Sequence, residues 1–299
     1  NIPDYERNTV ETARLAIAAR AHLLEFAREV GADFDMEQRG ILHVYRKQSE
    51  FDHARRVNSL LEKAGLERRE VSAEEVQRIE PALQADTIGG VYTESDVTGD
   101  SHRYTRALSE ACARMGVVFH YKCKVTEVVH AGAGVRLTWD DAGVPEAQDF
   151  DGIVICAGVG SRAIAAELGD RVNIYPVKGY SITVNLDDVE SQAAAPWVSL
   201  LDDEAKIVTS RLGRKRFRIA GTAEFNGYNL DIRDDRIRPL REWCEACFPD
   251  VSTEHCVPWA GLRPMLPSMM PKVGPGKRPG VYYNTGHGHL GWTLSAATA

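Results

Sequence analysis

One short segment restricts the folds open to this chain more than any other. Residues 151–156 form an apolar run, Asp-Gly-Ile-Val-Ile-Cys, of the kind that lies buried in the middle of a sheet. A turn of small residues, 157–161, follows at once, and a helical pattern then continues to residue 168. Parallel strands cannot be joined by a tight hairpin, so a strand that leads directly into a helix indicates a parallel α/β unit.

The rest of the chain mixes helices with a second type of sheet. From residue 176 onward, β-branched and aromatic runs alternate with turn residues, which is typical of antiparallel strands. Strands are expected near residues 40–45, 117–121, 125–129, 135–139, 178–184, 205–209 and 216–221. Apolar spacing and capping residues predict helices near 8–31, 49–64, 72–80, 100–115 and 234–247. We therefore expect an α/β (α+β) fold that contains both parallel and antiparallel sheets.

Composition excludes two classes of protein. With 299 residues, 43% of them hydrophobic and 26% charged, the chain has the make-up of a globular protein with room for two domains. A net charge of −7 argues against a nucleic-acid partner, because nucleic acids select for basic surfaces. No apolar run approaches the roughly 18–20 residues of a transmembrane helix. The six cysteines are dispersed, which is typical of reduced thiols and favours the cytoplasm.

A single arginine near the end of the chain is a candidate binding residue. Arg263 lies in the segment Trp-Ala-Gly-Leu-Arg-Pro, 259–264, among apolar neighbours. A guanidinium group in such surroundings needs an anionic or carbonyl partner. One interpretation is a structural ion pair with one of the 43 acidic residues. The other is bidentate capture of a substrate carboxylate, which matches the planar fork of donors that arginine presents.

Two glycine-containing turns are candidates for holding a cofactor. Residues 286–291, Gly-His-Gly-His-Leu-Gly, follow an apolar strand, and residues 157–161 follow another. Such turns expose backbone N–H groups to an electron-rich ligand. The turn at 157–161 has the simpler alternative of packing a helix closely on its strand. With Arg263, the turn at 286–291 suggests a small acid held against a cofactor.

Other polar residues have more ordinary explanations. His287 and His289 could bind a metal, but no third ligand has convincing spacing. Cys244 and Cys247, near His255 and Cys256, could bind zinc, yet their helical spacing favours small hydrophobes in the core. We therefore expect no metal site. Tyr180 could supply a pocket hydroxyl or be a core aromatic residue.

The order of these motifs resembles a known family. The segments 99–100, 117–129, 154–161 and 176–180 (Pro-Val-Lys-Gly-Tyr) look, in that order, like the FAD-dependent D-amino-acid oxidase superfamily. Adding 220–225, 259–264 and 286–293 narrows the likeness to its bacterial D-amino-acid dehydrogenase branch. The resemblance covers nearly the whole chain. Members open with an ADP-binding βαβ unit containing Gly-x-Gly-x-x-Gly, a motif that these 299 residues lack.

The resemblance implies two interleaved domains. Residues 1–90 and 176–280 would form a substrate-binding domain with a mixed or antiparallel sheet. Residues 91–175 and 281–299 would be the remaining parts of an incomplete FAD-binding domain. A chain without the ADP-binding unit is expected to bind little FAD and to be inactive alone.

The resemblance also assigns residues to the site. Arg263 would hold the substrate carboxylate, while Tyr180 and His287 would be pocket residues. The remaining implied residues share a role in binding FAD. They are Val125, Ala157, Gly158, Ser161, Gly286, Gly288, Gly291 and Thr293.

The implied reaction is oxidative deamination of a D-amino acid. A hydride passes from the α-carbon to the flavin, and hydrolysis of the imine yields a 2-oxo acid and ammonia. Electrons would leave to a quinone or another acceptor, in the cytoplasm or peripherally at the inner membrane. Two alternatives remain: a cofactor-less module that binds small carboxylates, and a flavin oxidoreductase of secondary amino acids such as proline or sarcosine.

Overall fold

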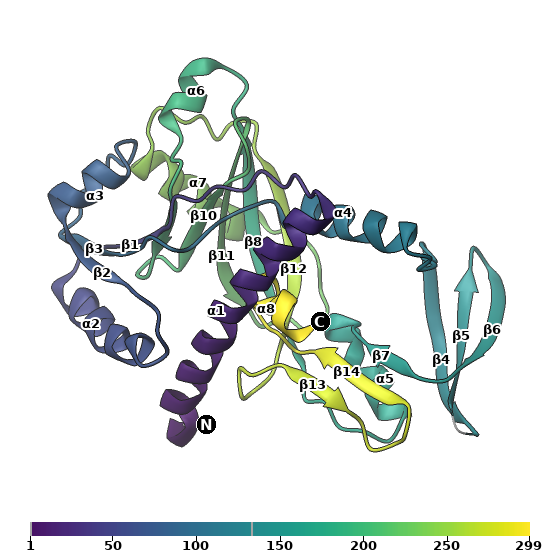
Figure 1. Ribbon diagram of the computed structural model, residues 1–299. Coiled ribbons are helices and arrows are strands. Elements are labelled where there is room, and N and C mark those ends of the chain that lie inside the picture. Colours follow the sequence, from purple (N-terminus) through teal and green to yellow (C-terminus); the bar gives the residue numbers. More distant parts are fainter. Residues whose placement is uncertain (1, 133) are drawn as a thin grey trace.

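The computed structural model describes residues 2–132 and 134–299 and contains three sheets within them (Figure 1). The helices are η1 (Ile2–Asp4), α1 (Tyr5–Val30), α2 (Gln48–Glu62), α3 (Ala73–Ile79), α4 (Ser101–Arg114), η2 (Gly158–Gly160), α5 (Ser161–Glu167), α6 (Val189–Ala194), α7 (Asp234–Cys247) and α8 (Gly291–Thr298). The strands are β1 (Ile41–Tyr45), β2 (Arg69–Ser72), β3 (Gly89–Thr93), β4 (Cys123–Ala131), β5 (Gly134–Asp141), β6 (Val144–Phe150), β7 (Ile153–Ile155), β8 (Tyr175–Asn185), β9 (Ser199–Asp202), β10 (Ile207–Arg211), β11 (Arg216–Glu224), β12 (Val257–Met265), β13 (Lys272–Pro275) and β14 (Val281–Thr285).

The largest sheet has eight strands in the order β12-β8-β11-β10-β9-β1-β3-β2. Neighbouring strands are antiparallel except β1 and β9, which are parallel. This confirms the antiparallel sheet expected after residue 176, and strands from the first third of the chain extend it. Helix α7 covers one face with the buried side chains of Ile237, Leu240 and Trp243. The opposite face of β12, β8 and β11 is left to build a site.

The parallel unit predicted from the sequence is present. Strand β7 pairs with β14 in parallel, with Ile155 opposite Tyr283, and α5 follows β7. Strand β13 completes this small sheet by pairing antiparallel with β14. Both β7 and β14 therefore end at the same edge of the sheet, and the two glycine-containing turns follow their ends.

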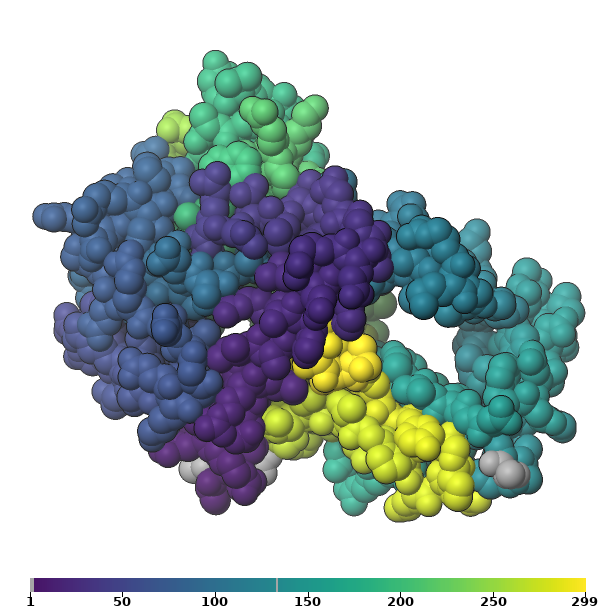
Figure 2. All heavy atoms as spheres, viewed as in Figure 1, coloured from purple at the N-terminus to yellow at the C-terminus, as the bar shows by residue number. Residues whose placement is uncertain are grey.

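A third sheet, of β4, β5 and β6, is antiparallel. In the space-filling view it stands apart from the main body, with a gap beside α4 (Figure 2). The strand expected at 117–121 is wrong, because this segment has no strand partner and pairing begins only at Cys123. Val118 is 75% exposed, so this apolar side chain is not buried against another element. Strand propensity alone does not form a ladder without a neighbouring strand.

Two distant helices fix the glycine turn at the end of the chain. Trp292 on α8 packs edge-on against Phe34 and Tyr104, with ring centroids 6.1 and 5.2 Å away. Leu23 and Ala27 of α1 lie in the same apolar cluster. The cluster joins α1, α4 and α8, so the start of α8 is held in place by the first helix of the chain (Figure 1).

The predicted domain boundaries cut across sheets at two places. Strand β3, at residues 89–93, belongs to the large sheet, although the boundary was expected between residues 90 and 91. Strand β13 pairs with β14, although the boundary was expected between 280 and 281. The two-domain division remains a prediction. Among the described residues, no helix combines the length and hydrophobicity that a bilayer crossing requires.

Asp202 offers a test of how the large sheet is held together. This carboxylate is 1% exposed and accepts hydrogen bonds from Arg46, from Trp243 Nε1 at 2.8 Å and from the backbone N–H of Ala205 at 2.9 Å. Asp202→Ala leaves these donors without an acceptor. We therefore expect the free energy of unfolding, measured by urea denaturation, to fall by about 3 kcal/mol. Asp52→Ala, on exposed α2, is the control and should change it by less than about 0.5 kcal/mol. Equal losses would contradict the role of Asp202.

Candidate active site

Arg263 lies on the open face of the large sheet. Strands β12 and β8 pair so that Gly261 is opposite Gly179 and Arg263 is opposite Val177. Residues two apart on a strand share a face, so Arg263, Gly261 and Gly179 lie on the same side. The guanidinium extends over Gly179, where a Cβ atom would lie only 2.3 Å from Arg263 Cζ. Only glycine at position 179 leaves room for the arginine in this position.

Among the described residues, the guanidinium of Arg263 has no acidic partner. Its Nη1 donates to the backbone oxygen of Thr222 at 2.9 Å. Over residues 2–132 and 134–299, no aspartate or glutamate forms an ion pair with it, so the structural ion pair considered from the sequence is not observed. Partial burial lowers the pKa of Arg263 because water is removed from the charged group. An unpaired, partly desolvated guanidinium is well suited to bind an anion.

A cavity of about 330 Å³ opens beside this guanidinium. The residues that line it include Gly179, Arg218, Trp259, Arg263, His289 and Trp292. Its walls carry two arginines and no acidic residue among those described. The cavity is therefore positively charged, of a size for a small molecule, and lined in part by the indole rings of Trp259 and Trp292.

The glycine turn is attached directly to the arginine strand. The N–H of Gly288 donates to the carbonyl of Pro264 at 3.0 Å, and Met265 forms a β-bridge with His287. Gly286 and Gly288 have φ angles of +78° and +60°, a conformation that favours glycine. The structure thus brings together the two halves of the predicted site, Arg263 and the turn 286–291.

The two histidines of this turn have different positions. His287 Nε2 lies 3.0 Å from Thr298 Oγ1 at the end of α8, so its ring nitrogen is engaged there. His289 lines the cavity, and partial burial and the charge of Arg263 lower its pKa. No group of three metal-ligating side chains exists within the described residues. Cys244 and Cys247 are at most 1% exposed and belong to the apolar core, which confirms that interpretation of their helical spacing.

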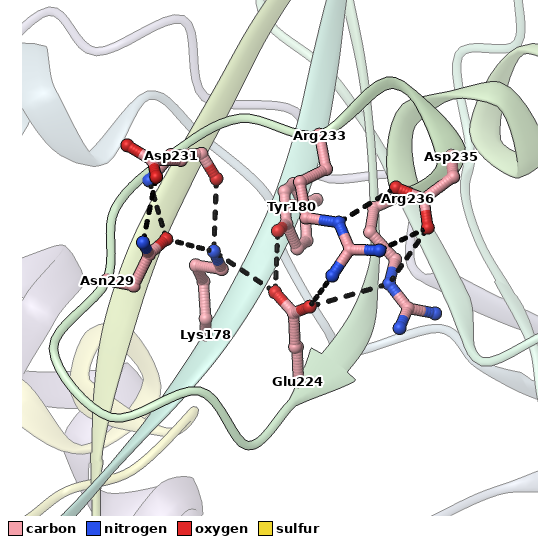
Figure 3. A network of polar contacts seen from close by, with 8 residues as sticks. All are labelled: Lys178, Tyr180, Glu224, Asn229, Asp231, Arg233, Asp235 and Arg236. Atoms are coloured by element: carbon pink, nitrogen blue, oxygen red, sulfur yellow. Dashed lines mark hydrogen bonds and ion pairs between the residues drawn. The ribbon is translucent and has the colours of Figure 1, made fainter.

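Tyr180 belongs to a polar network behind the sheet (Figure 3). It follows Gly179 on β8, so its side chain leaves the strand on the opposite face. The hydroxyl of Tyr180 donates to Glu224 Oε2 at 2.6 Å, and the side chain is 1% exposed. Its backbone borders the cavity, but the hydroxyl is occupied by Glu224. Of the two interpretations of Tyr180, a core aromatic residue describes this position better.

The same network holds a fully buried lysine. Lys178 Nζ lies 3.1 Å from Glu224 Oε2 and also bonds Asn229 Oδ1 and the carbonyl of Asp231, both at 3.0 Å. Hydrogen bonds from Tyr180 and Lys178 lower the pKa of Glu224. Arg233 adds a further contact to Glu224 from the loop that follows β11 (Figure 3). The network anchors that loop to β8 on the face opposite to Arg263.

The turn after β7 has a backbone that a phosphate group could approach closely. Gly158 has φ +54°, and a Cβ there would meet nothing within 4 Å, so its backbone borders open space. Ala157 is exposed. Ser161 is buried, and its Oγ lies 2.8 Å from Thr285 Oγ1, which ties this turn to β14. Ligands of parallel sheets bind beyond the carboxyl ends of the strands, which is where these two turns meet.

The remaining predicted cofactor residues lie further apart. Gly291 lines the main cavity. Thr293 is exposed at the start of α8 and lines two neighbouring cavities, of about 240 and 390 Å³, on the side of α1. Val125 is 42% exposed on β4, in the projecting sheet. No structural contact joins Val125 to the Arg263 cavity among the described residues, so its role remains a prediction.

Sequence reasoning missed three lining residues. Arg218 on β11, Trp259 on β12 and His289 all border the cavity. The alternation of side chains along β11 could have shown that Arg218 lies on the other face from the buried Phe217 and Ile219. Only the pairing of β11 with β8, and of β8 with β12, brings Arg218 toward Arg263. That pairing is not visible in local sequence patterns.

Comparison with known proteins is consistent with this geometry. The family model described as DAO, FAD dependent oxidoreductase, matches residues 2–299. A protein named D-amino acid dehydrogenase 3 from Mesorhizobium japonicum is 58% identical over 299 residues, which are 100% of this chain and 72% of that protein. A D-amino acid dehydrogenase from Paramagnetospirillum magneticum is 40% identical over 297 residues, covering 98% of this chain and 69% of that protein.

Solved structures share the fold at low sequence identity. Glycine oxidase from Geobacillus kaustophilus has a TM-score of 0.83 at 21% identity, with 95% of this chain and 76% of that chain covered. L-alpha-glycerophosphate oxidase from Mycoplasma pneumoniae, solved with FAD bound, has a TM-score of 0.81 at 14% identity, with 97% and 80% covered.

Proposed function

The chain belongs to the DAO family of FAD-dependent oxidoreductases, and on this premise we propose that it oxidises small D-amino acids to 2-oxo acids and ammonia. The D-amino acid dehydrogenases among its relatives support this choice. FAD, when bound, supplies the chemistry by accepting the hydride of the α-carbon. Water then hydrolyses the resulting imine. The protein's part is to bind and orient the amino acid.

One observation carries the proposal: a guanidinium fork without an acidic partner faces a small cavity. Arg263 is held over Gly179 and is fastened, through Pro264 and Gly288, to the turn 286–291. A substrate carboxylate would complete the hydrogen bonds of Arg263 and fix the position of the α-carbon. A cofactor-less carboxylate-binding module would need the same arginine, but it would not need the two glycine-containing turns at the edge of the small sheet.

The residues present fit the flavin group. Gly158 leaves its backbone next to open space at the carboxyl end of β7, and Gly288 has a backbone that only a small residue allows, since a Cβ would lie 2.7 Å from Met265 Sδ. These two turns would hold the phosphate and ring portions of FAD, together with Gly286, Gly291 and Thr293. Ser161 would support the first turn indirectly, since its hydroxyl is bonded to Thr285.

No side-chain base is required for this reaction in the cavity. None of the described lining residues is acidic, and the lowered pKa of His289 favours its neutral form. The substrate's amino group would lose its proton to water or to the neutral ring of His289 before or during binding, and Arg263 would contact the α-carboxylate.

The arrangement of the chain supports two cooperating parts. The large sheet would bind the substrate, while the small sheet of β13, β14 and β7, with α5 and α8, would bind the cofactor. We propose that electrons pass from the reduced cofactor to a quinone or another acceptor, and that the protein works in the cytoplasm or peripherally at the inner membrane.

Since these 299 residues are expected to bind little FAD alone, the proposal is tested on a form that includes an ADP-binding unit and is loaded with FAD, called the FAD-loaded protein. It is mixed with amino acids without oxygen. We expect D-amino acids to bleach the flavin absorbance and their L-enantiomers to leave it unchanged. Sarcosine and L-proline serve as the matched test of the secondary-amine alternative. Bleaching by L-enantiomers or by these secondary amines alone would overturn the proposed substrate class.

A further inference from the structure

We propose that Arg218 is a second anion-binding residue of the cavity and that the substrates are D-amino acids with a carboxylate in the side chain, such as D-aspartate or D-glutamate. This inference rests on the proposed function. In this arrangement Arg263 holds the α-carboxylate and Arg218 holds the side-chain carboxylate.

Strand register places Arg218 on the face that carries Arg263. Ala220 of β11 is opposite Ser181 of β8, and Ser181 is opposite Trp259 of β12. Arg218, two residues from Ala220, therefore shares this face, while its neighbours Phe217 and Ile219 are fully buried on the other. Both arginines line the same cavity of about 330 Å³.

Arg218 lacks the partners of a structural arginine. Within the part of the chain that the structure describes, its guanidinium forms no ion pair and no side-chain hydrogen bond. Arg216, two residues earlier on the same strand face, shows the contrast: its Nη2 lies 2.8 Å from Asp100 and 3.1 Å from Asp35. Burial lowers the pKa of Arg218, and the charge of Asp100, which is itself paired with Arg216, opposes this shift only in part.

Trp259 fixes Arg218 in the cavity wall. The Cζ atom of Arg218 lies 5.2 Å from the centroid of the Trp259 ring, which is within the range of a cation–π contact. The same indole lies over Gly261, where a Cβ would be 2.1 Å from Trp259 Cη2. Gly261 pairs with Gly179, so the indole and the Arg263 guanidinium lie over paired residues of neighbouring strands, and the indole also contacts Arg218. The cavity wall therefore offers two charged groups and an apolar surface that contacts one of them.

The charge of the cavity favours a substrate with two carboxylates. Two arginines face it and none of its described lining residues is acidic, so a singly charged ligand leaves one positive charge uncompensated. A D-amino acid with methylene groups between its carboxylates would place these groups against Trp259. Each charge-assisted contact strengthens binding beyond that of a neutral amide of the same shape.

The test compares acids with their amides, which differ only in charge. We expect kcat/KM of the FAD-loaded protein to be about 10- to 100-fold higher for D-glutamate and D-aspartate than for D-glutamine and D-asparagine. Arg218→Leu should remove this preference and leave the values for the amides within about threefold. Arg218→Lys, which keeps the charge but loses the planar fork, should retain part of it.

Binding gives a second readout that does not depend on turnover. Calorimetry should show that glutarate binds the FAD-loaded protein more tightly than butyrate, and that Arg218→Leu abolishes the difference. Arg238→Leu, at a side chain 65% exposed on α7, is the matched control. It should change neither the ratio of kcat/KM between acids and amides nor the ratio of glutarate to butyrate affinity. FAD content should be the same in all variants.

Several results would overturn the inference. One is that the unmutated protein has equal kcat/KM for acids and amides. The others are that Arg218→Leu lowers kcat/KM for acids and amides by the same factor, or that this variant loses FAD. If Arg218→Leu does not fold, the ratio of glutarate to butyrate binding in the unmutated protein decides. Failure of every D-amino acid to reduce the flavin would instead remove the proposed function.

Discussion

Arg263→Ala is expected to lower kcat/KM for D-amino acids by about 100- to 1,000-fold. The variant removes a partly desolvated guanidinium that has no acidic partner among the described residues and borders the cavity. Without it, the substrate carboxylate loses a bidentate contact and the α-carbon is no longer held in one position. Steady-state kinetics on the FAD-loaded protein measures the loss, mostly as an increase in KM.

Two further variants separate charge from geometry in this result. Arg263→Lys keeps a positive charge but cannot donate two parallel hydrogen bonds, so we expect a loss between those of the unmutated protein and the alanine variant. Arg238→Ala, at an exposed position of α7, should leave kcat/KM unchanged. FAD content and the unfolding temperature should match across the set. Unchanged kinetics in Arg263→Ala would remove this residue from the site.

Gly179→Ala should lower kcat/KM by about 10- to 100-fold without changing the fold. A Cβ at this position would lie 2.3 to 2.4 Å from three atoms of the Arg263 guanidinium, so the arginine must move away from its place over the strand. The backbone at Gly179 does not have a positive φ, so alanine introduces no strain of its own. Circular dichroism and thermal unfolding should therefore be close to those of the unmutated protein.

A double-mutant cycle shows whether this effect passes through the arginine. In an Arg263→Ala background there is no guanidinium to displace, so adding Gly179→Ala should lower kcat/KM by less than about threefold. Additive losses would mean that Gly179 acts independently of Arg263, for example on the backbone of β8. The cycle uses the same D-amino acid and the same FAD-loaded protein throughout.

Local signals predicted most elements of the fold. Ser72 with Glu75 forms the expected capping box of α3, Asp100 caps α4, and Gly31 ends α1 in the left-handed conformation. These features depend on residues within one turn of each other. The sheet order could not be predicted in the same way, because β1 from the first third of the chain pairs with β9 from the second half. Such pairing depends on tertiary packing and leaves no local pattern.

The candidate site was predicted in part for the same reason. Arg263 and the turn 286–291 are close in sequence, and one hydrogen bond from Gly288 to Pro264 joins them. Arg218 lies on a strand that reaches the site only through β8, so no spacing rule connects it with Arg263. For Tyr180 the sequence left two interpretations open, a pocket hydroxyl and a core aromatic residue. Neighbouring residues of a strand point to opposite faces, so the position of Gly179 under Arg263 directs the Tyr180 side chain to the other face.

The two faces of β8 allow this enzyme's selectivity and its stability to evolve separately. Lys178 and Tyr180 secure the rear of the strand through Glu224, while Gly179 alone serves the front. Substitutions on the front face, at Gly179 or at Arg218 on the neighbouring strand β11, would therefore change substrate binding while the rear network stays intact. An insertion or deletion of one residue in β8 would exchange the faces and lose both properties at once. Lineages that diverge in substrate should thus differ here by substitution, at constant strand length.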